Sequence, residues 1–351
     1  MIQQIELSNF KCFTSLKLPL APLTLLSGLN NSGKSSILQA LRMIVSYNET
    51  ADPTLTEHGG VETTRSDKSD KKSSISIKIT DANSLFYELI FSEHDAYLNN
   101  TPDFLVPLTS YLCAERWGPR NFLPLYAKMG ELKDVGCHGE YVLDFLERHQ
   151  LNSIPKRLKH VSSEGDTLEY NVRGWLSEIA PNVVFRQEVF KRMDVAQATF
   201  NSHRPANVGF GLSYALPVIV LLLGMAADWG DETPTARHKF RHGALVMIEN
   251  PEAHLHPKGQ VAMGRLIALT AACGEQVIVE THSDHIMDGI RIAVKQGLLS
   301  AAKTAFHYFA IEDGKHRVQS PTLRDNGKLE YWPEGFFDQT VKSMAILARR
   351  D

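Results

Sequence analysis

The chain has little cysteine. Its 351 residues include four scattered cysteines: Cys12, Cys113, Cys137 and Cys273. None belongs to a Cys-x-x-Cys pair, the spacing typical of zinc sites and redox motifs. Small secreted domains, in contrast, carry many closely spaced cysteines in disulfides. We therefore expect neither a zinc site nor a disulfide framework, and this cysteine usage fits a reducing compartment.

An excess of charge of one sign is also absent. Lysine and arginine number 37 and aspartate and glutamate 40, which leaves a net charge of -3. This balance gives no overall attraction to nucleic acid or to an anionic membrane, so any contact with DNA must come from a local patch. Basic residues gather locally in one region of the chain. This region is either a solvated face or a patch that binds DNA or a partner protein. Its members are Lys156, Arg157, Lys159, His160, Arg186, Lys191 and Arg192.

Long hydrophobic runs are missing as well. The most apolar run covers 13 residues, 215–227, and contains Pro217 and Gly224. A helix that spans a bilayer needs about 20 apolar residues. Met1 leads directly into an alternating strand pattern rather than into a secretory signal. We expect a cytoplasmic protein without membrane contact, in which residues 215–227 form a buried helix.

The sequence does contain one stretch around which the rest is organised. A short apolar run predicts a buried strand, and it leads through a glycine-rich loop into a helix expected to begin at Ser35 and to end near residue 45. The loop reads Gly28-x-x-x-x-Gly33-Lys34-Ser35, which fits the pattern of a nucleotide-binding P-loop.

The chemistry of a polyphosphate explains these residue types. Glycines let many backbone N–H groups converge on the phosphates, and the helix N-terminus adds further N–H groups with its positive dipole end. Lys34 is expected to bridge phosphate oxygens as a catalytic residue, and the Ser35 hydroxyl to bind Mg²⁺. The loop residues predicted to bind the nucleotide are Asn30, Asn31, Ser32, Gly33, Lys34, Ser35 and Ser36.

Two further apolar runs end in polar residues that suit the same chemistry. Residues 244–248 predict a strand buried on both faces, and Glu249 follows at its end, where a carboxylate can hold the Mg²⁺ of a nucleotide. Residues 276–280 predict another buried strand, which is followed by His282. A histidine in this position can contact a γ-phosphate.

Three other segments complete the prediction. Residues 47–74 mix charges of both signs, which favours a solvated flexible loop. Two alternating runs within residues 75–91 predict a β-hairpin with one buried face. Residues 207–214 form a glycine-rich turn ahead of the apolar helix, and both a second anion site and a plain helix entry explain it.

Together these stretches resemble the ABC-type ATPase heads of the SMC, RecF and OLD branch. The most specific pieces, residues 248–257 and 332–338, resemble a group of short, stand-alone bacterial ATPases of defence or DNA-processing operons. The resemblance implies an α/β fold, namely a P-loop head with a mostly parallel core sheet, an antiparallel β subdomain and an inserted helical lobe. It divides the chain into an N-terminal ATPase lobe (1–103), the inserted lobe (104–206) and a C-terminal ATPase lobe (207–351).

The resemblance also assigns roles. Residues 28–35 match Walker A, residues 245–249 match Walker B, and His282 matches the switch histidine. Glu249 takes the place of the magnesium ligand, whereas Asn250 stands where relatives carry the glutamate that polarises the attacking water. Glu252 is the nearby carboxylate that could substitute, so hydrolysis is expected to be slow. Lys11 lies in the opening turn that helps to hold the adenosine, and Ser213 would contact ATP in trans.

The family mechanism encloses ATP between a P-loop of one subunit and a signature turn of another. We therefore expect a head-to-tail homodimer that closes on two ATP and acts as a switch in DNA processing or anti-phage defence, with DNA or a partner effector such as a nuclease. The alternative is an OLD-type nuclease, in which such a head is joined to a Toprim domain. No acidic Toprim set is visible in the 69 residues after His282.

Overall fold

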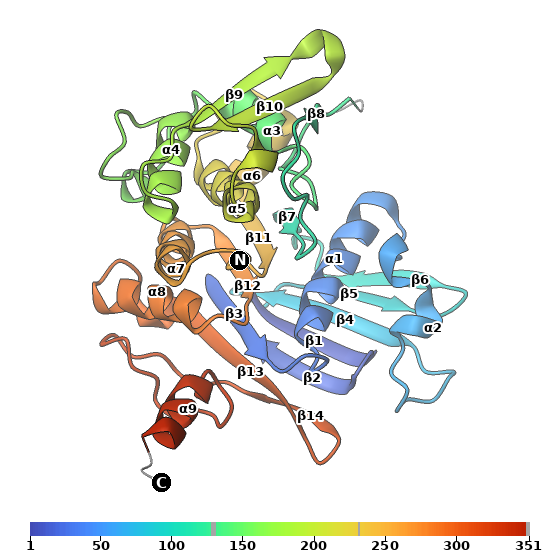
Figure 1. The fold of residues 1–351 in the computed structure, drawn as a ribbon. Helices are drawn as coiled ribbons and strands as arrows, with labels where there is room; N and C mark the ends of the chain where they lie inside the picture. The colour runs from blue at the N-terminus through green and yellow to red at the C-terminus, as the bar shows by residue number, and fades with distance from the viewer. Residues whose placement is uncertain (128–130, 231, 349–351) are drawn as a thin grey trace. The chain divides into compact units, whose positions relative to one another are not determined.

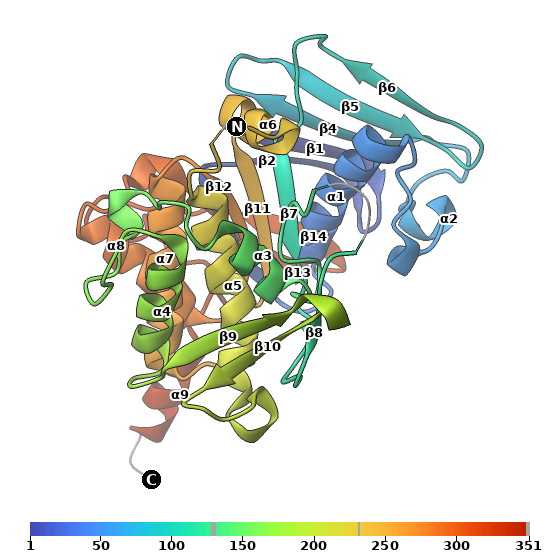
Figure 2. The same cartoon turned by 90° about the horizontal axis from the view of Figure 1, so that it is seen from above.

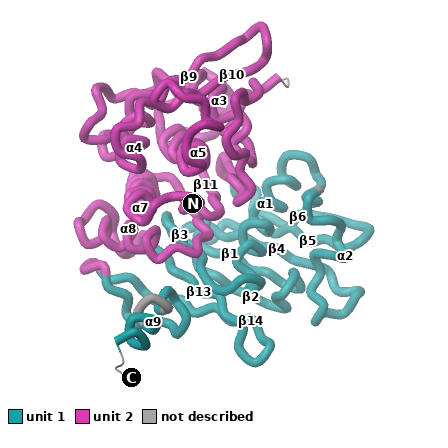
Figure 3. Tube along the Cα trace, viewed as in Figure 1, with its two compact units in different colours: residues 1–106, 304–324, 328–351 teal, residues 107–303, 325–327 magenta. Residues whose placement is uncertain are grey.

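The computed structural model describes residues 1–127, 131–230 and 232–348. By its internal contacts the chain forms two compact units (Figure 3). Unit 1 combines residues 1–106, 304–324 and 328–351, and unit 2 combines residues 107–303 and 325–327. These two units rest on internal contacts and do not test the predicted division into three lobes at residues 103 and 206. That division stays a prediction.

Unit 1 contains a five-stranded antiparallel sheet with the order β2-β1-β4-β5-β6. The alternating apolar side chains of β1 and β4 lie on one buried face, where Ile5 pairs with Leu18 on one side and Ile79 on the other. The pairing of β4 with β5 confirms the predicted hairpin. The bounds are β1 Ile2–Phe10, β2 Phe13–Pro19, β4 Ile75–Asp81, β5 Phe86–Phe91 and β6 Ala96–Asn100.

The P-loop strand and helix also belong to unit 1. Strand β3 (Leu23–Gly28) pairs in parallel with β13 (Thr304–Glu312), and β14 (Lys315–Gln319) pairs antiparallel with β13. Helix α1 (Lys34–Thr50) follows the loop (Figure 1). One apolar face of α1 is buried. The helix runs about one turn further than the sequence predicted and ends at Ala51, which adopts a left-handed φ of 58°.

The polar segment after α1 is largely exposed, as its mixed charge predicted, but parts of it form regular structure. It contains a short 3-10 turn, η1 (Thr56–His58), and a short helix, α2 (Val61–Thr64). Backbone hydrogen bonds tie it to the β1–β2 turn, since Lys11 N–H donates to the Thr64 carbonyl (2.7 Å) and Ser66 N–H to the Asn9 carbonyl (3.0 Å). These contacts give the segment a fixed place, which its composition alone does not reveal. Near the C-terminus, unit 1 ends with helix α9 (Gln339–Leu347).

Unit 2 is built on three parallel strands in the order β12-β11-β7. The side chains of β11 and β12 are buried on both faces, as their continuous apolar runs predicted, whereas those of β7 alternate between buried and half-buried. Helix α5 packs on β11 and α7 on β12, and Figure 2 shows α5 alongside α3 and α4. The bounds are β7 Leu108–Leu112, β11 Ala244–Glu249, β12 Gln276–Glu280, α5 Phe210–Ala226, α7 Pro257–Ala272 and α8 Asp284–Lys295.

A second, three-stranded antiparallel sheet of unit 2 has the order β8-β10-β9. Helix α5 packs closely against α3. A Cβ added to Gly224 of α5 would lie only 2.4 Å from Cε1 of Phe145 in α3. The remaining bounds are β8 Leu123–Pro124, β9 Phe185–Phe190, β10 Val195–Phe200, α3 Val142–His149, α4 Leu168–Ile179 and α6 Pro234–His242. Across residues 1–127, 131–230 and 232–348, no helix combines the length and the apolar content that crossing a membrane requires.

Candidate functional site

The glycines of the P-loop stand where no other residue fits. Gly28 has a φ of 143°, and a Cβ added there would lie 2.1 Å from the Phe309 carbonyl oxygen of the neighbouring strand. Gly33 has a φ of 105°, and its Cβ would lie 2.6 Å from Cζ of Phe13. Both positions combine a left-handed backbone with a close approach. The loop is therefore shaped by its glycines, as the motif predicted.

Lys34 is enclosed by this loop. Its side chain is buried, and Nζ donates hydrogen bonds to the carbonyl oxygens of Leu29 (2.7 Å) and Gly28 (3.1 Å). The Ser32 hydroxyl donates to the same Leu29 carbonyl at 2.7 Å. A buried ammonium needs partners of this kind, because burial without hydrogen bonds disfavours the charged form. The loop thus holds a positive charge at its centre.

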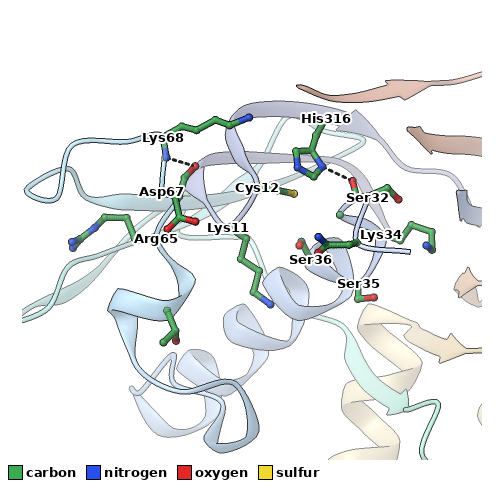
Figure 4. A pocket seen from close by; sticks show the side chains of 14 residues that line it. Lys11, Cys12, Ser32, Lys34, Ser35, Ser36, Arg65, Asp67, Lys68 and His316 are labelled. Carbon is green, nitrogen blue, oxygen red and sulfur yellow. Dashed lines mark hydrogen bonds between the residues drawn. The ribbon is translucent and has the colours of Figure 1, made fainter. Parts of the chain in front are cut away.

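A pocket of about 470 Å³ opens in front of the loop (Figure 4). Cationic side chains surround it, and the described residues that line it include one carboxylate, Asp67. Hydroxyl groups of Ser32, Ser35, Ser36 and Thr63 also line it. Such a lining matches a polyphosphate in charge and in hydrogen-bonding capacity. The lining cations are Lys11, Lys34, Arg65 and Lys68.

The predicted nucleotide-binding residues of unit 1 mostly meet at this pocket. Asn31, Ser32, Gly33, Lys34, Ser35 and Ser36 line it together with Lys11, whereas Asn30 lies exposed in the loop and does not. Burial lowers the pKa of the Lys11 ammonium, and the neighbouring Cys12 partly offsets this effect. Burial likewise raises the pKa of the Cys12 thiol, which keeps it neutral beside the loop.

Sequence reasoning missed a second group of pocket residues. Thr63, Arg65, Ser66, Asp67 and Lys68 come from the segment after α1, and His316 comes from β14. Nδ1 of His316 donates to the Ser32 carbonyl at 3.0 Å (Figure 4). The His316 ring also meets the Phe13 ring edge to face. The basic residues in the polar segment could have indicated an anion-binding role. The acidic residues between them made the segment look like a loop of mixed charge instead.

In unit 2, Glu249 at the end of β11 is held by the end of β7. Its Oε1 accepts from the Tyr111 hydroxyl at 2.9 Å and its Oε2 from the Ala114 N–H at 3.1 Å. The buried Arg116 donates from Nη1 to the Glu249 carbonyl (2.8 Å) and from Nη2 to the Asn250 carbonyl. Burial lowers the pKa of Arg116. Sequence reasoning missed this support, which fixes Glu249 in one orientation.

Glu252 and His282, both predicted site residues, are linked directly. The Glu252 carboxylate accepts from the Thr281 hydroxyl at 2.7 Å and from the His282 N–H at 2.9 Å. The His282 side chain is exposed, and Ser283 caps the following helix by accepting from the Ile286 N–H at 3.1 Å. The loops after β11 and β12 therefore form one hydrogen-bonded assembly.

Asn250 occupies a left-handed position, with a φ of 45°, at the start of the loop after β11. Its N–H donates to the Glu280 carbonyl at 2.8 Å. Its buried Oδ1 accepts no hydrogen bond from the part of the chain that the structure describes. An amide oxygen cannot take up a proton at neutral pH, so this residue offers no general base.

Ser213 lies inside the first turns of α5, since that helix begins at Phe210 rather than after the glycine-rich turn. Its Oγ is buried, and no described residue is a hydrogen-bond partner for it. It lines a small cavity of about 30 Å³ together with Leu216 and Pro217. This hydroxyl is thus directed into unit 2 in the present conformation, and its predicted contact in trans stays a prediction.

Two family models match the chain. A family model described as an AAA ATPase domain matches residues 1–135 and 140–287. A second model, described as a protein of unknown function, matches residues 299–347. Among curated proteins, an OLD nuclease from Thermus scotoductus is 38% identical over 45 residues, which are 13% of this chain and 8% of that protein.

Solved structures share the fold at low sequence identity. An SMC head bound to the C-winged helix domain of ScpA is 13% identical, has a TM-score of 0.54 and covers 92% of this chain and 98% of its own. An Smc head domain with an extended coiled coil bound to the C-terminal domain of ScpA, derived from Pyrococcus furiosus, is 12% identical, has a TM-score of 0.50 and covers 99% of both chains. At these identities the similarity shows the fold alone, and it confirms the predicted α/β class with its parallel motif-bearing strands.

Proposed function

This chain belongs to the family of AAA ATPase domains and has the fold of SMC heads, and from this premise we propose that its P-loop binds the triphosphate of ATP. The observation that carries the proposal is the buried Lys34 ammonium at the base of a pocket lined by three further cations. On binding, Lys34 would exchange the Gly28 and Leu29 carbonyls for phosphate oxygens. Before ATP binds, those two carbonyls hold the Lys34 side chain in place.

Magnesium fits the oxygen donors of the predicted site. Mg²⁺ prefers hydroxyl, carboxylate and phosphate oxygens, and the exposed Ser35 hydroxyl and the oriented Glu249 carboxylate are the proposed ligands. When bound, the ion would neutralise charge on the phosphates. Tyr111, Ala114 and Arg116 hold the backbone and the carboxylate of Glu249 in place for this task.

We propose that hydrolysis is slow. Asn250 cannot act as a base, and both oxygens of Glu252 already accept hydrogen bonds from the loop that carries His282. These hydrogen bonds support a role for Glu252 in positioning the His282 loop, in addition to its predicted role in polarising the attacking water. His282 is exposed and is proposed to contact the γ-phosphate. A slowly hydrolysing site suits a protein whose bound nucleotide serves mainly as a clamp.

A head-to-tail homodimer that closes on two ATP is the proposed form of that clamp. The fold similarity to SMC heads supports it, as does the presence of a P-loop and a signature-like helix entry in one chain. Because the Ser213 hydroxyl is buried, we propose that the start of α5 rearranges before it reaches a nucleotide across the dimer. The closed dimer would act as a switch in DNA processing or anti-phage defence, with DNA or a partner effector.

The decisive experiment measures binding of ATP with magnesium to Lys34→Ala and to a matched control, Lys71→Ala, an exposed lysine outside the pocket. Loss of charge-assisted hydrogen bonds of about 1.5–3 kcal/mol should weaken ATP binding at least tenfold in Lys34→Ala and leave the control unchanged. Light scattering should show a dimer on ATP addition for the control only. Equal affinity and equal dimerisation of the two variants would refute the proposal.

A nuclease activity of the OLD type is the second candidate, and the short match to an OLD nuclease favours it. Incubation of supercoiled plasmid with the purified chain and Mg²⁺ or Mn²⁺ distinguishes the two candidates. We expect no cleavage by the chain alone. Metal-dependent nicking that disappears in Glu249→Gln would establish the nuclease instead.

A further inference from the structure

Three potential metal ligands of unit 2 meet beside the end of β7. The sulfur atoms of Cys113 and Cys137 and a ring nitrogen of His138 all lie within 4.8 Å of one another. Cys113 is buried, and the other two side chains are half-buried. The cysteines are 24 positions apart in the sequence, so the fold rather than a spacing motif brings them together.

Backbone hydrogen bonds hold the two contributing segments in register. Cys113 N–H donates to the Cys137 carbonyl and Trp117 N–H to the His138 carbonyl, both at 2.9 Å. The His138 N–H in turn donates to Oε2 of Glu140 at 2.9 Å. These three hydrogen bonds restrain the backbone on both sides of the cluster, so it has little freedom to rearrange. The donor atoms are therefore placed before any ligand arrives.

We propose that Cys113, Cys137 and His138 bind a zinc ion. Sγ of Cys113 lies 3.1 Å from Nδ1 of His138, and the Glu115 carbonyl oxygen lies 2.6 Å from that nitrogen and 3.3 Å from the same sulfur. Zinc takes sulfur at about 2.3 Å and histidine nitrogen at about 2.0–2.1 Å in a tetrahedron. Its neighbouring ligands are then roughly 3.3–3.8 Å apart, so small side-chain rotations suffice.

The proton balance of this step is simple. Each cysteine binds as a thiolate, so the two thiols release two protons to solvent. In the free protein Nδ1 of His138 donates its proton to the Glu115 carbonyl, and on binding that proton moves to Nε2, so that Nδ1 coordinates the ion. The Glu115 carbonyl oxygen or a water completes the fourth position. No oxidant or reductant is required.

The donor chemistry selects the metal. Two thiolates and an imidazole suit Zn²⁺, whereas Mg²⁺ prefers oxygen ligands. The magnesium that accompanies a nucleotide would therefore not compete for this site. A disulfide between Cys113 and Cys137 is the competing use of the same sulfurs, and it would remove them as ligands.

The ion would act on Glu249 through the segment that it holds. Cys113 is followed by Ala114, whose N–H donates to the Glu249 carboxylate, and by Arg116, whose guanidinium donates to the Glu249 and Asn250 carbonyls. Fixing Cys113 therefore fixes the support of Glu249. This consequence rests on the proposed function, whereas metal binding itself does not.

Cobalt titration of the reduced, metal-free protein tests the proposal, because Co²⁺ replaces Zn²⁺ and gives a sulfur-to-cobalt absorption band only with thiolate ligands. We expect one equivalent to bind with this band in the presence of excess Mg²⁺, and one equivalent of Zn²⁺ to displace it. Cys113→Ser and Cys137→Ser should weaken binding at least 100-fold. The matched control Cys273→Ser, at the end of α7, should bind as the wild type does.

Folding of each variant is checked by circular dichroism, and His138→Gln replaces any cysteine variant that does not fold. The proposal is overturned if the folded, reduced wild type gives no thiolate band, or if the band survives in Cys113→Ser. Because the readout needs no nucleotide, failure here leaves ATP binding by the P-loop untouched. Failure of ATP binding would equally leave the metal result standing.

Discussion

The carboxylate of Glu252 accepts the backbone N–H of His282 at 2.9 Å, so the loop after β11 holds the loop after β12. Its second oxygen accepts the Thr281 hydroxyl at 2.7 Å. A carboxylate is the group that accepts from two such donors at once, since an amide presents one oxygen and a nitrogen that only donates. The orientation of His282 therefore depends on the charge state and shape of this one side chain.

From this relationship we predict that Glu252→Gln hydrolyses ATP at least tenfold more slowly and binds ATP with nearly unchanged affinity. One hydrogen bond to the His282 loop is lost, worth about 1.5–3 kcal/mol when the acceptor is charged, and each 1.4 kcal/mol in a barrier is about tenfold in rate. Steady-state phosphate release and equilibrium ATP binding measure the two quantities.

The matched control for this change is Glu188→Gln, an exposed glutamate on β9 of the same unit. It should turn over ATP at the wild-type rate. A Glu252→Gln variant that hydrolyses ATP as fast as this control would show that the bond to His282 has no part in catalysis.

We predict next that His316→Ala weakens ATP binding about fivefold. The His316 ring donates to the carbonyl of Ser32 in the P-loop, and loss of one hydrogen bond of about 1 kcal/mol leaves that carbonyl without this donor. The loop then becomes less ordered before the phosphates arrive. Isothermal titration with a non-hydrolysable ATP analogue measures the effect. The control, His94→Ala, removes an exposed histidine of unit 1, and equal affinities in the two variants would contradict the prediction.

A third prediction concerns stability rather than binding. Gly28→Ala should lower the free energy of unfolding by about 4 kcal/mol, because its Cβ would lie 2.1 Å from a backbone carbonyl at a left-handed φ. Gly314→Ala is the control: its φ is 71° and nothing lies within 4 Å of the added carbon, so backbone strain alone should cost about 1 kcal/mol. Urea unfolding of both variants gives the comparison. Similar losses would mean that the P-loop shifts to admit the methyl group.

The parts of the molecule that followed from the sequence are those with a strong local pattern. The apolar runs before Gly28, Glu249 and His282 predicted buried strands, and all three are strands in the structure. Alternating side chains predicted the hairpin of β4 and β5. In each case the hydrophobic period is set by residues within one element, so no knowledge of the rest of the chain is needed.

Contacts between distant parts of the sequence had no such local signal. Arg65 and Lys68 belong to a segment whose mixed charge predicted a solvated loop, yet hydrogen bonds to the β1–β2 turn bring it to the pocket. Cys113 and Cys137 have no metal-site spacing and still lie beside each other. Their proximity is fixed by pairing of two backbone segments, which side-chain patterns do not encode.

The last prediction is that the stability of unit 1 falls as the pH is lowered from 6.5 to 4. Burial lowers the pKa of His307 to about 4, only partly offset by its hydrogen bond to the Pro19 carbonyl. The unfolded chain binds the proton near pH 6.5 and the folded one does not, so the stabilisation is complete above pH 6.5 and is lost as the pH falls. A difference of this size corresponds to about 3 kcal/mol. Urea midpoints at several pH values should show this slope for the wild type and a shallower one for His307→Gln, and identical slopes would exclude His307 as the cause.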